Sequence, residues 1–139
     1  MKKIMSTLLC AGVLMSSCVP KHEGKESKSV QEQTVKPVIL VGETLKYNYG
    51  EDVYLVSFRS KTKLHWKCLE GSEQGKEATE TYKLQQIGTH RVFIAWVEAD
   101  GLGVSQVLDL KTNKVYSYLK IDQELVALEG IITKPTTRQ

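Results

Sequence analysis

The clearest indication of the fold lies in residues 91–120, RVFIAWVEADGLGVSQVLDLKTNKVYSYLK. Three short runs rich in Val, Ile, Tyr and Trp are separated there by Asp100-Gly101 and Thr112-Asn113, residues that tolerate the backbone angles of tight turns. Runs of β-branched and aromatic residues with turn residues between them are typical of strands joined by hairpins. This part of the chain therefore predicts an antiparallel meander.

The same pattern continues through the chain after Pro37, with turn residues about every ten positions and no helix-length amphipathic segment. We expect an all-β fold of eight strands in an antiparallel up-and-down barrel, because closure removes exposed strand edges. Eight strands enclose room for side chains or for one small ligand. The expected strands lie near Thr44–Tyr49, Val53–Arg59, Lys63–Leu69, Glu77–Gln86, Arg91–Glu98, Gly103–Leu110, Lys114–Lys120 and Glu124–Thr133.

The N-terminus has the order of a secretory signal: a basic start, an apolar run over residues 4–15 and small residues before Cys18. The apolar run is too short to span a bilayer as a helix, which takes roughly 20 apolar residues. Residues 14–18, LMSSC, resemble a lipobox, whose cysteine is acylated after cleavage. We expect residues 1–17 to be a lipoprotein signal peptide and Cys18 to be the lipidated first residue of the mature protein. The alternative, a buried helix, would need an amphipathic pattern that this run lacks.

Residues 18–37 connect the expected lipid site to the barrel domain, residues 38–139. From Val19 to about Val35 the segment is almost entirely polar, so it cannot bury enough apolar surface to offset its ordering entropy. We expect a disordered tether that holds the domain roughly a few tens of ångströms from the membrane. The expected location is the bacterial cell envelope, at the inner or the outer membrane, with the domain in the periplasm or at the cell surface.

Charge and cysteine content exclude some classes of function. The net charge of +3 falls to +1 when Lys2 and Lys3 leave with the signal, and a near-neutral domain without a basic cluster is not expected to bind nucleic acid. Cys68 is the one cysteine after Cys18; we interpret it as a small buried hydrophobe, with a nucleophile as the alternative. His65 is expected to face solvent, and the histidines lack the spacing of a metal site. We expect no metal and no cofactor.

Side chains alternate across the strand expected at residues 91–98, and both of its faces are apolar. One face carries Val92, Ile94, Trp96 and Glu98, and the other carries Phe93, Ala95 and Val97. Since a lone small barrel buries only its inner face, the second face predicts a cover, either a partner subunit or a terminal segment. We expect a homodimer through this face.

Two sets of polar residues are candidates for a site inside the barrel. If Trp96 faces the interior, Glu98 ends an apolar stripe, where desolvation would raise its pKa and suit it to donate a proton. The alternative is a solvent-exposed glutamate at a strand end. Tyr47 and Tyr49 also share one face and direct two hydroxyls the same way, although tyrosine is common on strands for its β propensity alone.

The segment WVEADG, residues 96–101, followed by Val104-Ser105, resembles the calycin-type barrels of phenolic acid decarboxylases and of the MoaF family, named for molybdenum-cofactor biosynthesis. Upstream, YNYG at residues 47–50 is similar to the first strand of the decarboxylases. Together these motifs make the resemblance extend over most of the mature domain.

In the decarboxylases the Trp-x-Glu strand places its glutamate inside the barrel as a proton donor, and the Tyr-x-Tyr strand orients the substrate carboxylate. Carried over, these roles fall on Glu98 and on Tyr47 and Tyr49. The decarboxylases also use an arginine before the Trp-x-Glu strand, whereas residues 71–80 contain none and Lys76 is the nearest cation. Lysine cannot make the bidentate contact of a guanidinium, which argues against the same reaction.

We therefore predict a membrane-anchored lipoprotein whose barrel binds a small, partly apolar and aromatic ligand without transforming it. The expected ligand-binding residues are Tyr47, Tyr49, Trp96 and Glu98, because they combine apolar contact area with a polar anchor. Two alternatives stay open. One is a carboxy-lyase with Glu98 as the catalytic proton donor, and the other is a structural lipoprotein with a barrel filled by side chains.

Overall fold

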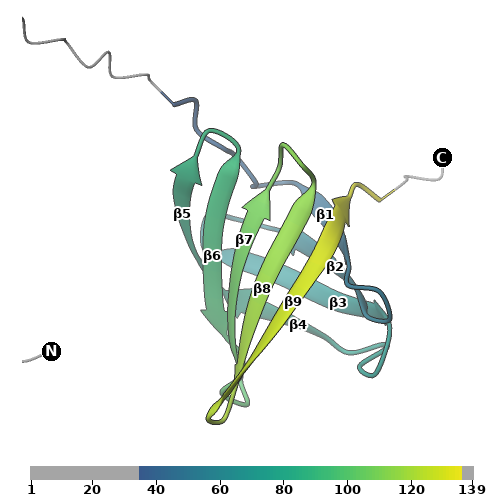
Figure 1. The fold of residues 1–139 in the computed structure, drawn as a ribbon. Coiled ribbons are helices and arrows are strands. Elements are labelled where there is room, and N and C mark those ends of the chain that lie inside the picture. Colours follow the sequence, from purple (N-terminus) through teal and green to yellow (C-terminus); the bar gives the residue numbers. More distant parts are fainter. Residues whose placement is uncertain (1–34, 136–139) are drawn as a thin grey trace, which may run out of the picture. The chain divides into compact units, whose positions relative to one another are not determined.

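A computed structural model describes residues 35–135 (Figure 1). The expected signal peptide, Cys18 and the expected tether as far as residue 34 lie outside the described residues, so these expectations stay predictions. Within the described range no helix is long and apolar enough to cross a membrane. Its regular elements are nine strands: β1 (Thr44–Asn48), β2 (Val53–Phe58), β3 (Lys63–Glu70), β4 (Glu77–Thr81), β5 (Lys83–Gly88), β6 (Arg91–Val97), β7 (Gly103–Asp109), β8 (Lys114–Ile121) and β9 (Glu124–Thr133).

The strands form one antiparallel sheet in the order β4-β3-β2-β1-β9-β8-β7-β6-β5. Strands adjacent in the sequence pair with each other, except for β4 and β5, and the pairing of β9 with β1 joins the two halves of the chain. Figure 1 shows the sheet curling into a nearly closed barrel. Gly101 and Asn113, at the predicted turns, have positive φ angles of 91° and 56°. The predicted all-β, antiparallel up-and-down barrel is confirmed.

The predicted number of eight strands is wrong at one place, because the segment 77–86 forms two strands rather than one. β4 pairs with β3, whereas β5 pairs with β6. Tyr82 lies between them: its backbone N–H donates to the Thr62 carbonyl, its hydroxyl donates to the Ser60 carbonyl at 2.9 Å, and its ring meets that of Phe58 edge-on. The chain therefore ends its pairing with β3 at Tyr82 before it begins to pair with β6. The backbone at Tyr82 connects β4 and β5, the two edge strands of the sheet.

The segment before β1 contributes a side chain to the core. Leu40 is buried there and belongs to the same core cluster as Phe58 and Tyr82. The backbone of that segment is held by Gln86, whose Oε1 accepts from the Val38 N–H at 3.0 Å and whose Nε2 donates to the Lys36 carbonyl at 3.0 Å. The described chain thus joins the barrel beside β5.

The two faces of β6 differ in exposure as the alternation predicts. Val92, Ile94 and Trp96 are buried on the inner face. On the outer face, Phe93 is 37% and Val97 is 65% exposed. The homodimer expected through this outer face stays a prediction.

Substitution of Tyr82 tests its part in closing the barrel. We expect Tyr82→Phe to lower the free energy of unfolding by about 1 kcal/mol, because the Ser60 carbonyl loses a donor. Tyr82→Ala should cost roughly 3–5 kcal/mol, because a buried ring is removed from the core. Chemical denaturation of each variant measures these values.

Tyr116, on the outer face of β8, is the matched control because its side chain is partly exposed. Tyr116→Ala should cost about 1 kcal/mol or less, the usual range for a strand surface position. Equal losses in Tyr82→Ala and Tyr116→Ala would contradict the closing role of Tyr82.

Candidate functional site

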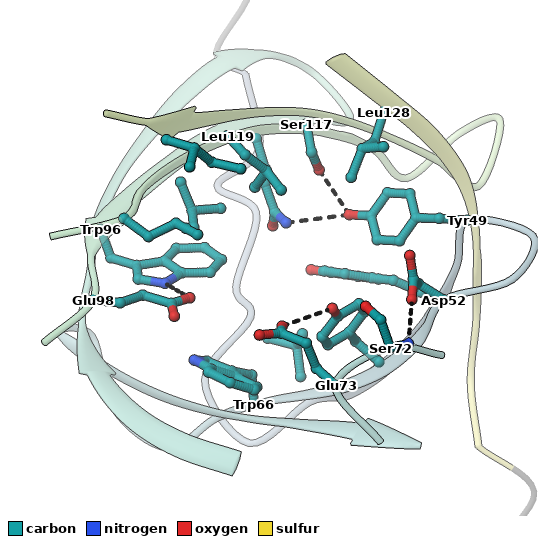
Figure 2. A pocket seen from close by; sticks show the side chains of 17 residues that line it. Tyr49, Asp52, Trp66, Ser72, Glu73, Trp96, Glu98, Ser117, Leu119 and Leu128 are labelled. Carbon is teal, nitrogen blue, oxygen red and sulfur yellow. Dashed lines mark hydrogen bonds between the residues drawn. The ribbon is translucent and has the colours of Figure 1, made fainter. Parts of the chain in front are cut away.

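The barrel contains a cavity of about 290 Å³, and Figure 2 shows the side chains that line it. The connections β1–β2, β3–β4 and β6–β7 contribute to its wall, together with inward-facing side chains of the strands. Six aliphatic side chains line it, and so do the polar residues Ser72, Gln106 and Ser117. The other lining residues are the aromatic Tyr47, Tyr49, Tyr54, Trp66 and Trp96 and the acidic Asp52, Glu73 and Glu98.

The four side chains predicted from the sequence all line this cavity. Tyr47 is fully buried, and its ring meets that of Tyr49 edge-on with centroids 6.4 Å apart. Trp96 Nε1 donates a hydrogen bond to Glu98 Oε1 at 3.3 Å, so the carboxyl group lies beside the indole, as Figure 2 shows. The structure thus brings the Tyr-x-Tyr and Trp-x-Glu pairs into one cavity. That they hold a ligand stays a prediction.

Burial raises the pKa of Glu98, the direction predicted from the sequence. The hydrogen bond from Trp96 lowers this pKa, while the negative charges of Glu80, Asp100 and Glu73 raise it further. Among the described residues that line the cavity, no lysine, arginine or histidine is present to oppose these charges. The Glu98 carboxyl group therefore retains its proton to a higher pH than a glutamate in water.

Gln106 and Ser117 are polar residues of the cavity that the sequence reasoning missed. The Tyr49 hydroxyl forms a 2.7 Å hydrogen bond with Ser117 Oγ and accepts a second from Gln106 Nε2 at 3.2 Å. Burial raises the pKa of Tyr49 to about 12, so it remains a neutral phenol. Gln106 and Ser117 interrupt the otherwise apolar inner faces of β7 and β8. That interruption was the sequence signal for a polar site, because a polar residue on a core face needs a hydrogen-bond partner inside the barrel.

Trp66 and Tyr54 extend the aromatic wall and were also missed. Their rings meet edge-on with centroids 6.1 Å apart, and Tyr54 lies at 6.3 Å from Tyr49 in the same way. The Tyr54 hydroxyl donates to Glu73 Oε2 at 3.2 Å, which places a carboxylate from the β3–β4 connection at the cavity. The period-2 alternation of β3, which turns Trp66 inward, was the signal for the indole.

Cys68 and His65 do not belong to the cavity. Cys68 is buried and its thiol donates to the Glu70 carbonyl at 3.1 Å, in agreement with its interpretation as a small buried side chain. His65 lies on the other face of β3, with Nδ1 at 3.1 Å from Thr79 Oγ1 and Nε2 at 3.4 Å from Glu77 Oε2. No group of side chains in residues 35–135 is arranged to hold a metal ion.

Three buried polar atoms of residues that line the cavity have no hydrogen-bond partner among the described residues: the Tyr47 hydroxyl, Trp66 Nε1 and Gln106 Oε1. These residues are 0%, 8% and 5% exposed. An unpartnered buried polar atom is uncommon in native proteins and costs about 1–3 kcal/mol. Together they present one donor, one acceptor and one hydroxyl that can act as either.

The fold and its internal cavity define a small calycin-like barrel. The MoaF-like family model matches residues 41–133, which include all the described strands. The chain therefore belongs to the MoaF-like family.

Among solved structures, the chain is similar to a protein from Burkholderia vietnamiensis described as a "putative beta-lactamase". The sequence identity is 18%, the TM-score is 0.67, and the match covers 72% of this chain and 99% of that one. At this identity the likeness shows a shared fold alone. No curated protein matches the chain.

Glu98→Gln tests the electrostatics of the cavity. Because the pKa of Glu98 in the folded protein lies above its ordinary value of 4.5, ionisation destabilises the folded state as the pH rises through the raised pKa. Glutamine keeps an acceptor for Trp96 Nε1 and does not ionise. The unfolding free energy of Glu98→Gln, relative to wild type, should therefore increase between about pH 4 and pH 7, as denaturation at both values measures.

Glu129→Gln removes the same charge from the outer surface, where Glu129 pairs with Lys114. Loss of that attraction should leave its relative stability unchanged or slightly lower at the higher pH. A Glu98→Gln difference that is constant or falls with pH would contradict the raised pKa.

Proposed function

We propose that this protein binds a small, partly apolar ligand inside the barrel without transforming it. The observation that carries the proposal is a cavity of about 290 Å³ lined by Tyr47, Trp66 and Gln106, each of which has a buried polar atom without a partner among the described residues. An apolar lining with a few convergent polar groups is the usual composition of a small-molecule site. A barrel filled by side chains, the structural alternative, accounts for neither the space nor these atoms.

The size and lining of the cavity restrict the ligand. Small-molecule pockets usually measure about 300–1,000 Å³, so a cavity of about 290 Å³ suits a ligand of roughly one ring with a short substituent. Tyr54, Trp66 and Trp96 line the cavity and favour a ligand with an aromatic body, because aromatic rings gain from edge-to-face and offset contacts. The proposed binding residues are these together with Tyr47, Tyr49 and Glu98.

A carboxy-lyase is the second candidate, favoured by the raised pKa of Glu98 on the cavity wall. In that reaction the substrate loses its carboxylate as carbon dioxide, and Glu98 supplies the proton that its double bond takes up. The described wall, however, holds no cation to orient a carboxylate. Lys76 is 65% exposed and its Nζ binds Glu73 Oε1 at 3.0 Å. Binding without turnover is therefore the better supported function.

We further propose that Cys18 carries a lipid anchor, that residues 1–17 are removed, and that the protein resides in the bacterial cell envelope. Support comes from the order of the first residues in the sequence.

Ligand binding is measurable through the two tryptophans, since both line the cavity. Hydroxycinnamic acids and related neutral or cationic phenols should be screened for a saturable change in Trp66 and Trp96 fluorescence. We expect at least one of these compounds to bind saturably. We expect no vinylphenol to form during long incubation of the acids with purified protein. Decarboxylation by wild type that disappears in Glu98→Gln would establish the lyase instead.

Tyr47→Phe tests whether the Tyr47 hydroxyl contributes to ligand binding. It removes an unpartnered hydroxyl, so the unliganded variant should be as stable as wild type or more stable by about 1–3 kcal/mol. Its affinity for a ligand that bonds the hydroxyl should fall by roughly threefold to tenfold. Absence of both binding and turnover across the panel would favour the structural barrel.

The lipid anchor is tested by metabolic labelling with a radioactive fatty acid. Wild type should incorporate the label and Cys18→Ala should not, because the acylated thiol is removed. Cys68→Ala is the matched control, since Cys68 is buried within the barrel and should not affect labelling. Equal labelling of wild type and Cys18→Ala would refute the anchor.

A further inference from the structure

The charged side chains of the cavity carry one sign. Within residues 35–135 the charged lining residues are Asp52, Glu73 and Glu98. Glu80 and Asp100 lie near enough to Glu98 to act on it electrostatically. The nearby cation is Lys76, whose ammonium binds Glu73 and also interacts with Asp100. The charged residues of the described lining are therefore all acidic, and Lys76 pairs with one of them, Glu73.

Aromatic rings surround these carboxylates. Figure 2 shows Glu98 and Glu73 directed into the interior beside the indoles of Trp96 and Trp66. The face of an aromatic ring attracts a cation, most strongly in tryptophan, and the attraction grows where water is excluded. Carboxylates and indoles that line the same cavity therefore both favour a cation.

The unpartnered atoms of the wall add a second, independent requirement. Tyr47 and Gln106 lie deep in the barrel and Trp66 Nε1 offers a donor, so these atoms call for a group that can both donate and accept. A hydroxyl does both, whereas an ammonium group only donates. A ligand that meets both requirements therefore carries its positive charge on one group and its hydroxyl on another.

We propose that the ligand of this cavity is a small organic monocation: an ammonium group on a short aromatic body that carries a hydroxyl. This inference rests on the proposed binding function and adds its charge class. The ammonium group lies near Glu98 and Glu73 against the indole faces, and the hydroxyl pairs with the unpartnered atoms of Tyr47 and Gln106. An anionic ligand of the same shape would meet like charges and no basic side chain on the described wall.

Three probes with one 4-hydroxyphenyl body and different charge test the proposal: tyramine, 4-ethylphenol and 3-(4-hydroxyphenyl)propanoate. Calorimetric titration should use the full-length protein in a nonionic detergent at neutral pH and low salt, so that the detergent adds no competing charge. We expect tyramine to bind at least tenfold more tightly than the propanoate, with 4-ethylphenol between them. The advantage of tyramine should shrink as salt is added, because salt screens charges near the surface.

Glu98→Gln separates charge from shape, since the two side chains are nearly isosteric. It should weaken tyramine binding by roughly threefold to tenfold, and clearly more than it weakens 4-ethylphenol binding. Glu129→Gln, the same change on the outer surface, should alter neither affinity. Residual binding of 4-ethylphenol by Glu98→Gln shows at once that the variant is folded.

The outcomes distinguish the inference from the function on which it rests. Propanoate binding as tight as that of tyramine would overturn the cationic ligand and leave the binding function standing. Equal affinity for tyramine and 4-ethylphenol, with no selective effect of Glu98→Gln, would also overturn it. Failure of all three probes at millimolar concentration would count against the proposed binding function itself, and the charge class would fall with it.

Discussion

The antiparallel pairing of β1 with β9 is the contact on which both the barrel and its cavity depend. It sets Tyr47 opposite Ile132, at the point where two segments far apart in the sequence meet. Gly130 lies against this junction: a Cβ there would come within 2.7 Å of the Asn48 carbonyl oxygen and of the Tyr49 ring. Because glycine has no side chain, the Tyr49 ring can lie across β9 and carry its hydroxyl to Ser117. The junction that joins β1 to β9 therefore also places Tyr49 at the cavity.

The cavity brings together residues on which the resemblance noted in the sequence rests, but its charge differs. Glu98 and Tyr47 both line it, and the described wall offers carboxylates and no cation. Membership in the MoaF-like family establishes the barrel, whereas function depends on the particular groups inside it. The charge of the wall is thus a better guide to the ligand than the fold.

The limits of prediction for the fold are clearest at Tyr82. Alternation and turn residues correctly indicate antiparallel strands, because each of these signals is local. The break at Tyr82 is not local: it arises because residues 77–81 pair with β3, while the strand after it pairs with β6. Both pairing partners are remote in the chain, so a continuous run of strand-forming residues could not reveal the change.

For the candidate site, the sequence by itself determined that Trp96 and Glu98 share one face and that Tyr47 and Tyr49 share another, since a strand alternates with a period of two. Only the tertiary structure decided that these faces meet in one cavity, that Trp66 and Gln106 join them, and that polar atoms there remain unpartnered. The physical reason is that alternation assigns a side chain to a face, whereas its neighbours across the barrel are set by strand register and closure.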